Sequence, residues 1–454
     1  MTNPNPESRR DFLKTSSIAG AAATITAAAT ARVHGAQDDD SIQVCLIGCG
    51  GRGTGAAANA MSVPDANVKL VGMADVMPHK LSISFRNLEQ EHKERMDVPE
   101  ERRWIGFEAY KQAMDYLRPG DVVILTTPVA FRWVMFSYAI EKGLNVFMEK
   151  PVATDGDACR RMFELAKKAD EKNLKVGVGL MCRHCDARRE LFDRIQEGQI
   201  GDLFLMRAYR LAGHTASAHS ERKPEGRNEL MWQIDRFHSF LWLSGGAFSD
   251  FLIHNIDEAC WMKNDWPVEA KASGGRHYRE DYVDQNFDTY SVEYTFKDGA
   301  KFYMEGRTMP GAHSEFATYV HGTRGSAIVS TAGHSPANPR IYEGHVMKKK
   351  HITWKYPEPE RNPYQLEWDH LIDAIKTDTP YNEAHRGIKA SLVTSMGRMA
   401  AHSGQIVTYD DMLNSEHVFA PGIDKLTLDS DSPLMADEDG RYPIPTPGLN
   451  SDEY

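Results

Sequence analysis

Short apolar runs alternate with amphipathic segments through the first part of the chain. The runs fall at 42–47, 68–75, 121–128, 145–151 and 176–180, and the stretch 131–142 has the period of a helix. Continuous apolar runs separated by helical patterns are typical of buried parallel strands, each followed by a helix. The pattern therefore predicts an α/β domain with a parallel sheet covered on both faces.

The pattern changes in the second part of the chain, where apolar and polar residues alternate. Residues 290–296 and 300–304 alternate on either side of the turn Asp298-Gly299, and further strands are expected near 267–274, 315–322 and 326–329. Helical periods return at 363–376 and 387–402. Alternation with tight turns indicates a half-buried antiparallel sheet, so this part is predicted to be an α+β domain.

The length of 454 residues and the apolar content of 41% are enough for two domains with large cores. We place a dinucleotide-type α/β domain at 40–180 and the α+β domain at 181–419. Residues 420–454 are rich in Pro, Gly and Asp and predict an extended tail that wraps the protein or is partly disordered.

Residues 1–36 resemble a twin-arginine export signal. Ser8-Arg9-Arg10-Asp11-Phe12-Leu13 precedes a mildly apolar run at 17–31 that is too short and too weak to span a membrane. We therefore expect an exported, periplasmic or extracytoplasmic protein with no integral membrane span after the signal is removed. The alternative is a disordered basic N-terminus.

Charge and cysteine content narrow the function classes. A formal net charge of −11 argues against nucleic acid as a partner. Six cysteines in a chain of this size do not require a disulfide framework. Cys182 and Cys185 form one C-x-x-C motif, but no second motif supplies the remaining ligands of a structural zinc ion, so no metal site is expected.

The glycine-rich segment after the first apolar run carries the clearest chemical signal. Its residues are Gly48, Cys49, Gly50, Gly51, Arg52 and Gly53, in a G-x-G-x-x-G pattern. Such a loop between a strand and a helix binds the pyrophosphate of a dinucleotide, and we expect the helix to begin near Thr54. Thr126 and Thr127 end a later strand at the same edge of a Rossmann-type sheet and are expected to contact the cofactor.

Asp75 ends the second predicted strand. A carboxylate there binds the ribose diol of NAD and repels the 2′-phosphate of NADP, so NAD is the favoured cofactor and NADP the less favoured one. The alternative is that Asp75 only caps a helix.

Three polar side chains form a candidate catalytic group. Lys150 follows Glu149 at a strand end, and Asp250 and His254 are four residues apart in a predicted helix. Dehydrogenation of a secondary alcohol needs a base for the hydroxyl proton, which we assign to His254, and a cation beside the oxygen, which we assign to Lys150. The alternatives are a surface lysine and a core histidine.

With these motifs, the chain resembles the glucose-fructose oxidoreductase, inositol dehydrogenase and rhizopine-catabolism (Gfo/Idh/MocA) family. The resemblance implies that Glu149 and Lys150 flank the nicotinamide and that Lys150, Asp250 and His254 are catalytic. It also implies an open antiparallel sheet through which the chain forms a homo-oligomer, a dimer or a tetramer. Two residues depart from the family pattern, Leu252 at a frequent glycine and Arg132 at a frequent histidine, so the substrate pocket is expected to differ.

Four residues are candidate substrate contacts: Arg132, Arg183, His184 and Asp257. The expected activity is NAD(P)-dependent oxidation of a secondary hydroxyl of a sugar, polyol or glycoside. The alternative is redox-neutral glycoside cleavage by oxidation, elimination and re-reduction; a third possibility is a noncatalytic dinucleotide-binding protein. Because an exported enzyme has no soluble cofactor pool, we expect NAD to be tightly bound.

Overall fold

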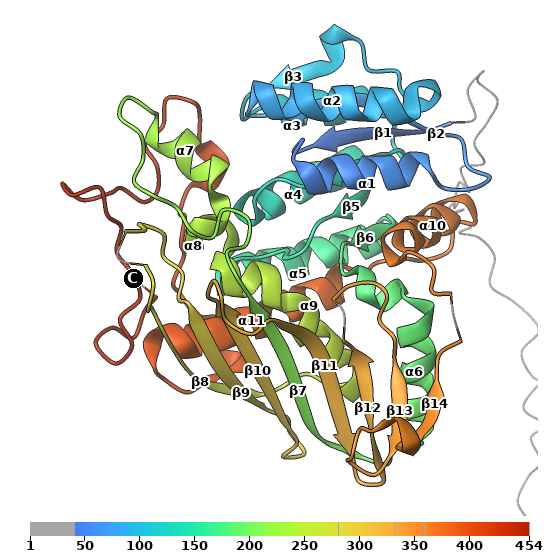
Figure 1. The fold of residues 1–454 in the computed structure, drawn as a ribbon. Helices are drawn as coiled ribbons and strands as arrows, with labels where there is room; N and C mark the ends of the chain where they lie inside the picture. Colours follow the sequence, from blue (N-terminus) through green and yellow to red (C-terminus); the bar gives the residue numbers. More distant parts are fainter. Residues whose placement is uncertain (1–40, 280, 332, 358, 454) are drawn as a thin grey trace, which may run out of the picture. The chain divides into compact units, whose positions relative to one another are not determined.

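The computed structural model describes residues 41–279, 281–331, 333–357 and 359–453, which belong to one compact unit. Its first sheet has six parallel strands in the order β3-β2-β1-β4-β5-β6, which confirms the predicted parallel sheet (Figure 1). The strands are β1 (Ile42–Ile47), β2 (Val68–Asp75), β3 (Arg103–Ile105), β4 (Val122–Leu125), β5 (Asn145–Met148) and β6 (Val176–Val178).

Helices cover both faces of this sheet because successive strand residues point to opposite sides. Val44 and Leu46 of β1 pack in one core cluster, while Cys45 and Ile47 pack in the other. The helices following these strands are α1 (Gly51–Met61), α2 (Pro78–His92), α3 (Ala109–Tyr116), α4 (Arg132–Lys142) and α5 (Gly156–Glu171).

The start of α1 corrects one prediction. The helix begins at Gly51, not near Thr54, because the Thr54 N–H already donates to the Gly50 carbonyl oxygen at 2.9 Å. Gly53 therefore lies inside the first helical turn rather than ahead of it.

The second sheet has nine strands and is mainly antiparallel, as predicted. Its order is β14-β13-β12-β11-β7-β10-β9-β8-β15, with one parallel pair, β7 and β10. The strands are β7 (Leu203–Ala212), β8 (Glu269–Gly275), β9 (Thr289–Thr295), β10 (Lys301–Thr308), β11 (Glu315–Gly322), β12 (Gly325–Ser330), β13 (Arg340–Glu343), β14 (Ile352–Lys355) and β15 (Val407–Thr408). The sequence pattern missed β7, which is the central strand between the two halves of this sheet.

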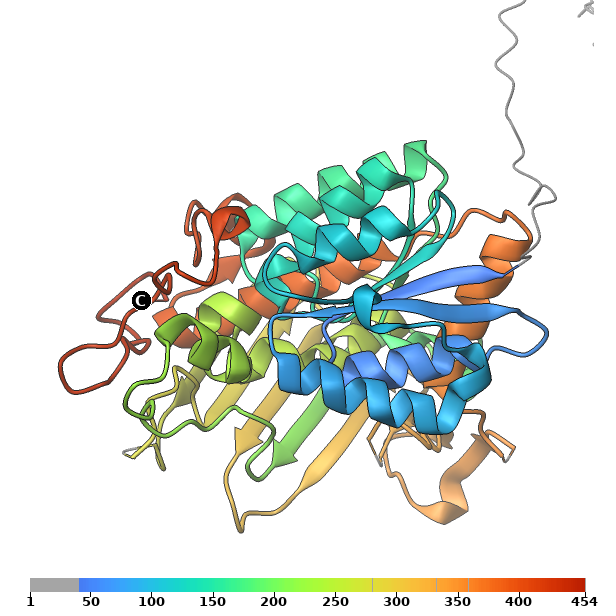
Figure 2. The same ribbon diagram turned by 90° about the horizontal axis from the view of Figure 1, so that it is seen from above.

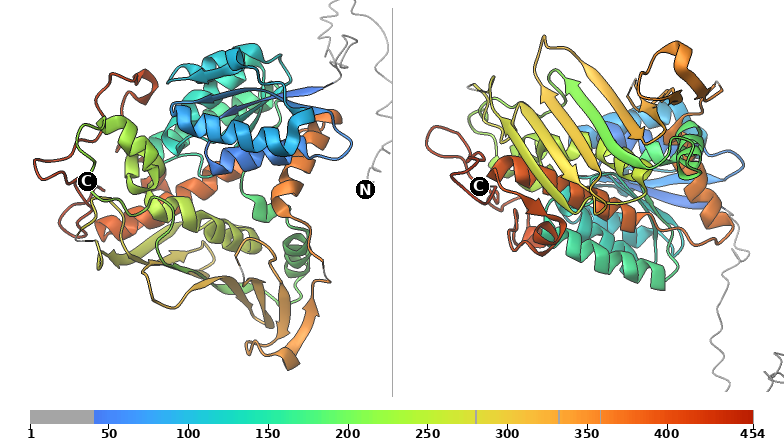
Figure 3. Two further views of the ribbon diagram at one scale, coloured as in Figure 1. Left: turned by 45° about the horizontal axis from the view of Figure 1, so that its top comes forward. Right: turned by 90° about the horizontal axis from the view of Figure 1, so that it is seen from below.

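Two long helices lie on one face of the second sheet, α9 (Gly246–Lys263) and α11 (Ala384–Ser403) (Figures 1 and 3). Of the 18 residues of α9, 16 are buried, since the helix packs against strands β7, β10 and β11 of the sheet and against α11 beside it. The remaining helices are α6 (Asp186–Gln196), α7 (Glu229–Asp235), α8 (Leu241–Ser244), α10 (Pro363–Lys376) and α12 (Tyr409–Asn414).

The segment that contains α10 returns from the second half of the chain to the first sheet. Trp368 stacks on Phe147 of β5 with ring centroids 4.5 Å apart, and the Val176 N–H donates to the Tyr381 carbonyl oxygen at 2.8 Å. Residues 363–383 therefore extend the core of the first domain, although the sequence places them within 181–419.

The tail after residue 420 winds along the protein without a strand or an α-helix (Figure 2). It is held by specific contacts, among them a hydrogen bond from the Gln233 amide to the Leu434 carbonyl oxygen at 2.8 Å. Near its end, the side chain of Glu453 is buried.

The predicted export signal lies outside the described residues. Within the described part of the chain, none of the helices combines the length and apolar character needed to cross a membrane.

Candidate active site

The glycine loop connects β1 to α1 at the carboxyl edge of the first sheet. Gly48 has φ +93°, and a Cβ at Gly53 would lie only 2.1 Å from the Gly48 carbonyl oxygen, so both positions require glycine. A Cβ at Gly50 or Gly51 would meet no atom within 4 Å, which leaves open space beside the backbone. This space in front of the N-terminus of α1 fits a pyrophosphate.

A second loop supports the glycine loop. The Thr126 hydroxyl donates to the Gly48 carbonyl oxygen at 2.6 Å, which fixes the end of β4 against the end of β1. Thr126 and Thr127 both line the adjoining pocket, and their contact with a cofactor stays a prediction.

Asp75 lies at the end of β2 and faces the same pocket. Its carboxylate accepts the N–H groups of Cys49 at 2.6 Å and Met77 at 2.8 Å, and burial raises its pKa. The N-cap position of α2 is Met77, so Asp75 is not the capping residue. Cys49 thus contributes a backbone N–H that orients the carboxylate, while its own thiol is buried.

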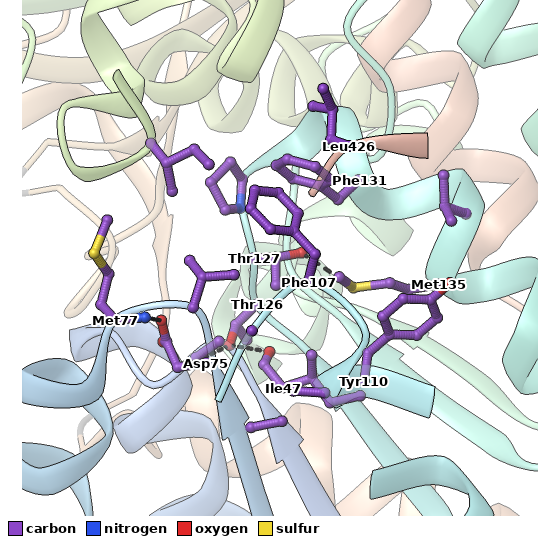
Figure 4. A pocket seen from close by; sticks show the side chains of 18 of the residues that line it. Ile47, Asp75, Met77, Phe107, Tyr110, Thr126, Thr127, Phe131, Met135 and Leu426 are labelled. Carbon is purple, nitrogen blue, oxygen red and sulfur yellow. Dashed lines mark hydrogen bonds between the residues drawn. The ribbon is translucent and has the colours of Figure 1, made fainter. Parts of the chain in front are cut away.

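The pocket beside Asp75 is predominantly apolar, and its walls come from segments far apart in the sequence (Figure 4). Its aromatic and sulfur-containing lining residues are Met77, Phe107, Tyr110, Phe131, Met135 and Phe237. The tail contributes Ile423, Asp424 and Leu426 to the same wall. The sequence pattern gave no signal for these tail residues because they lie nearly 350 positions after Asp75.

Glu149 faces the glycine loop from the end of β5. Its carboxylate accepts the Arg52 guanidinium through Nε at 3.1 Å and Nη2 at 2.5 Å. Arg52 also lies over the Tyr364 ring at 4.7 Å. The ion pair therefore joins two residues that the sequence assigned to cofactor binding, Arg52 and Glu149.

Lys150 and Asp250 are in direct contact. Lys150 Nζ donates to the Asp250 carbonyl oxygen at 2.7 Å and lies 3.4 Å from its Oδ1. His238, which the sequence analysis missed, places Nε2 3.3 Å from Asp250 Oδ2, and its Nδ1 is 2.8 Å from the Ser217 hydroxyl. Burial alone would raise the pKa of Asp250, but Lys150 and His238 lower it to about 2.

His254 lies one helical turn after Asp250 on α9, as the spacing predicted. It is buried, and no hydrogen-bond partner of its Nδ1 is found among the described residues. Burial lowers its pKa well below the usual value, and the neighbouring His334 and Lys150 lower it further. The imidazole is therefore neutral near pH 7 and has a free lone pair, as a proton acceptor requires.

The electrostatic surroundings of His254 favour an anion. The positive groups that lower its pKa or that of His334 are Lys150, Arg210, Arg188 and Arg52. A positive group beside a buried oxygen stabilises the charge that forms when the oxygen loses its proton, so Lys150 suits formation of an alkoxide here.

The four candidate substrate contacts have partners within the protein. Arg132 is 1% exposed and donates to the Leu125 and Thr127 carbonyl oxygens at 2.6 and 3.0 Å, so it holds the loop after β4. Its assignment to substrate stays a prediction.

Arg183 and Asp257 pair with each other, with Nη2 to Oδ1 at 2.7 Å and Nε to Oδ2 at 2.9 Å. His184 lies 3.1 Å from the Glu383 carboxylate and 2.8 Å from His370 Nδ1. These contacts support the turn after β6, and the assignment of Arg183, His184 and Asp257 to substrate stays a prediction.

Cys182, His254 and His334 bring potential metal-ligand atoms within 4.8 Å of one another. The positive groups around the two imidazoles oppose a divalent cation, and burial raises the pKa of the Cys182 thiol. The sequence expectation of no metal site stays a prediction. All six cysteines, including Cys182 and Cys185, are buried free thiols.

The fold and site together define a class of protein. The site has the three parts of a nicotinamide-dependent oxidoreductase. A glycine loop lies at a helix N-terminus, an acidic residue ends β2, and a lysine, a carboxylate and an imidazole form the third part.

Comparisons with known proteins establish the family. A family model described as "Oxidoreductase family, NAD-binding Rossmann fold" matches residues 42–178, and the "GFO/IDH/MocA C-terminal domain" model matches 189–328. The chain belongs to the Gfo/Idh/MocA oxidoreductase family.

Curated relatives are distant. The chain is 23% identical to the uncharacterized oxidoreductase YrbE of Bacillus subtilis over 65% of this chain and 79% of that protein. It is 27% identical to scyllo-inositol 2-dehydrogenase (NAD(+)) of the same organism over 48% of this chain and 57% of that protein, and 23% identical to the rhizopine catabolism protein MocA of Rhizobium meliloti over 49% and 63%.

Solved structures share the fold. An aldose-aldose oxidoreductase from Caulobacter crescentus has a TM-score of 0.63 at 18% identity and covers 81% of this chain and 99% of its own. A scyllo-inositol dehydrogenase from Lactobacillus casei, solved with NAD(H) and scyllo-inositol, has a TM-score of 0.59 at 20% identity and covers 82% and 99%.

Proposed function

We propose that this chain is an NAD-dependent dehydrogenase that oxidises a secondary hydroxyl of a sugar, polyol or glycoside. The observation that carries the proposal is the contact of Lys150 with Asp250, one helical turn from a neutral His254. The printed names of the relatives, inositol dehydrogenases among them, support the substrate class.

The residues divide the chemistry between them. The glycine loop and Asp75 would hold NAD, which would supply the acceptor for the hydride of the carbinol carbon. His254 takes the hydroxyl proton, and Lys150 lies beside the oxygen and stabilises its negative charge. Asp250 holds the Lys150 ammonium group in place through the 3.4 Å contact with Oδ1.

We infer that the cofactor stays bound between turnovers. Ile423, Asp424 and Leu426 of the tail form part of the wall of the pocket beside Asp75, where the adenosine half of NAD would lie. A segment that must move before the nucleotide leaves slows its dissociation. Retention would suit an exported enzyme, which the twin-arginine motif at Arg9 and Arg10 supports.

We also propose that the second sheet mediates a homo-oligomer. One face of this sheet is covered by α9 and α11, while Phe204 on β7 and Tyr303 on the neighbouring β10 are 46% and 38% exposed. Exposed aromatic residues on a sheet face are typical of a protein interface.

The decisive experiment is denaturing release of nucleotide from the purified protein with mass spectrometry, followed by absorbance at the nicotinamide band on addition of sugars and polyols. Copurified NAD that becomes reduced in place supports the proposal. If the protein is active only with added NAD, the proposed dehydrogenase activity stands and the proposed retention of the cofactor is wrong. Release of reducing sugar from glycosides without net reduction would indicate redox-neutral cleavage instead.

Lys150→Ala separates catalysis from simple nucleotide binding. The variant should keep bound NAD and lose at least about 100-fold in turnover, the usual effect of removing a group that stabilises the transition state. Full activity in this variant would point to a noncatalytic role of the site.

A further inference from the structure

Four cations surround the two imidazoles of the active site, and three of them have a carboxylate partner. The pairs are Arg52 with Glu149, Lys150 with Asp250, and Arg188 with Glu258. The net charge of each pair is close to zero, because the carboxylate balances the positive charge of its partner.

Arg210 is the exception among the described residues. It lies near the end of β7, and its guanidinium stacks over Phe316 at 3.7 Å. Across the parts of the chain that the structure describes, no carboxylate lies within 4.0 Å of this guanidinium, and no protein group accepts a hydrogen bond from it.

Ring contacts connect Arg210 to the catalytic imidazole. Phe316 meets His334 edge-on with centroids 4.9 Å apart, and His334 meets His254 at 4.4 Å. Arg210, on β7 of the second sheet, is therefore linked to His254 through two aromatic contacts, and its charge is among those that lower the pKa of His254.

An uncompensated guanidinium in such a place is costly. Burial lowers the pKa of Arg210 to about 10, which reflects the loss of hydration of its charge. Stacking on an aromatic ring recovers only part of this loss. A planar guanidinium with free N–H groups matches the paired oxygens of a carboxylate or phosphate.

We propose that Arg210 binds an anionic group on the substrate, so that this enzyme acts on sugars that carry a carboxylate or a phosphate. The inference rests on the proposed dehydrogenase function and names the substrate class of that site. Lys150 and His254 act on the hydroxyl, while Arg210 pairs with the anionic group and so fixes the orientation of the ring.

The test is calorimetric titration of the NAD-loaded protein with matched sugars. The probes are D-glucuronate, D-galacturonate and D-glucose 6-phosphate, each compared with its neutral parent sugar. We expect at least one anion to bind about 10- to 100-fold more tightly than its parent, the range for a charge-assisted pair. Preference for the uronates or for the phosphate identifies the anionic group.

Two substitutions locate the effect. Arg210→Gln should remove the preference for the anion and leave binding of the neutral sugar within about threefold, while Arg210→Lys should keep part of the preference. Arg207→Gln is the matched control, because Arg207 lies on the same strand and also stacks on an aromatic ring, that of Tyr319 at 4.1 Å. Bound NAD in each variant reports an intact fold.

The outcomes separate the two proposals. Anions that bind no more tightly than their neutral parents, or a preference that survives Arg210→Gln, overturn the anion subsite. If anions bind in an Arg210-dependent way but no sugar reduces NAD, the anion subsite is supported and the dehydrogenase proposal is wrong. If the protein oxidises neutral sugars and Arg210→Gln does not change their rate of oxidation, the dehydrogenase proposal is supported and the anion subsite is wrong.

Discussion

The Glu453 carboxylate, near the end of the chain, pairs with Arg398 on α11: Oε1 lies 2.7 Å from Nε and Oε2 lies 2.8 Å from Nη2. Arg398 also donates to the Ser249 hydroxyl at 2.8 Å and to the Thr154 carbonyl oxygen at 3.0 Å. Ser249 precedes Asp250, and Thr154 lies four residues after Lys150. One guanidinium thus joins the tail to both segments that carry the proposed catalytic group.

The first prediction concerns this ion pair and its pH dependence. Burial alone would raise the pKa of Glu453, but Arg398 and His402 lower it to about 2, compared with about 4.3 in an unfolded chain. The stabilisation is fully present above the unfolded value and is lost as the pH falls through the folded value. It amounts to roughly 3 kcal/mol.

Glu453→Gln should destabilise the protein by about 3 kcal/mol at pH 7, because it leaves Arg398 buried without a counter-charge. Urea unfolding between pH 7 and pH 3 measures the effect, and the loss of stability with acid should be shallower in the variant. Glu438→Gln, an exposed change in the same tail, is the control. Equal acid sensitivity of the Glu453 variant and the wild type would contradict the assignment.

The second prediction concerns cofactor retention. Leu426→Ser removes an apolar side chain from the wall of the pocket beside Asp75 and should speed release of NADH about 10-fold, since a Leu side chain contributes about 1.5–3 kcal/mol when buried. Leu428→Ser provides a matched control two residues away, where the side chain is 49% exposed. Stopped-flow fluorescence of bound NADH gives the rate. If both variants release at the wild-type rate, the tail does not hold the cofactor.

The third prediction concerns the choice between NAD and NADP. Asp75→Ser removes the carboxylate that would repel a 2′-phosphate, so the preference for NAD should fall about 10- to 100-fold. Comparing the dissociation constants of NADH and NADPH gives the ratio, with thermal unfolding as the check on folding. The check is needed because Asp75 also accepts the Cys49 and Met77 N–H groups. An unchanged ratio would show that Asp75 does not contact the ribose.

The fourth prediction concerns His238 as a positioning residue. His238→Asn removes a donor from Asp250 Oδ2, and the pKa of Asp250 should rise from about 2 towards its usual value. The acid limb of the kcat/KM profile should therefore move to higher pH. His313→Asn, at a side chain that is 77% exposed, is the control. A lower rate with an unmoved acid limb would indicate a purely structural role of His238.

Local patterns were sufficient for most elements of the first domain. Strands β1, β2 and β4 are continuous apolar runs whose ends carry the glycine loop, Asp75 and Thr126, and adjacency in a parallel sheet brings such ends together. The spacing of Asp250 and His254 predicted that they lie on the same face of a helix, because a helix has 3.6 residues per turn. These relations are local, so the sequence alone determined them.

Contacts between distant segments were decided only by the tertiary structure. Packing brought Ile423 and Leu426 to the pocket beside Asp75, His238 to Asp250, and Arg210 to the ring of Phe316, which contacts His334 beside His254. Arg132 is a further example. The motif gave its position in the chain, but it did not predict that its side chain donates to the Leu125 and Thr127 carbonyl oxygens. Periodicity fixes which face a residue occupies, whereas its partner depends on how the faces of the whole chain are buried against each other.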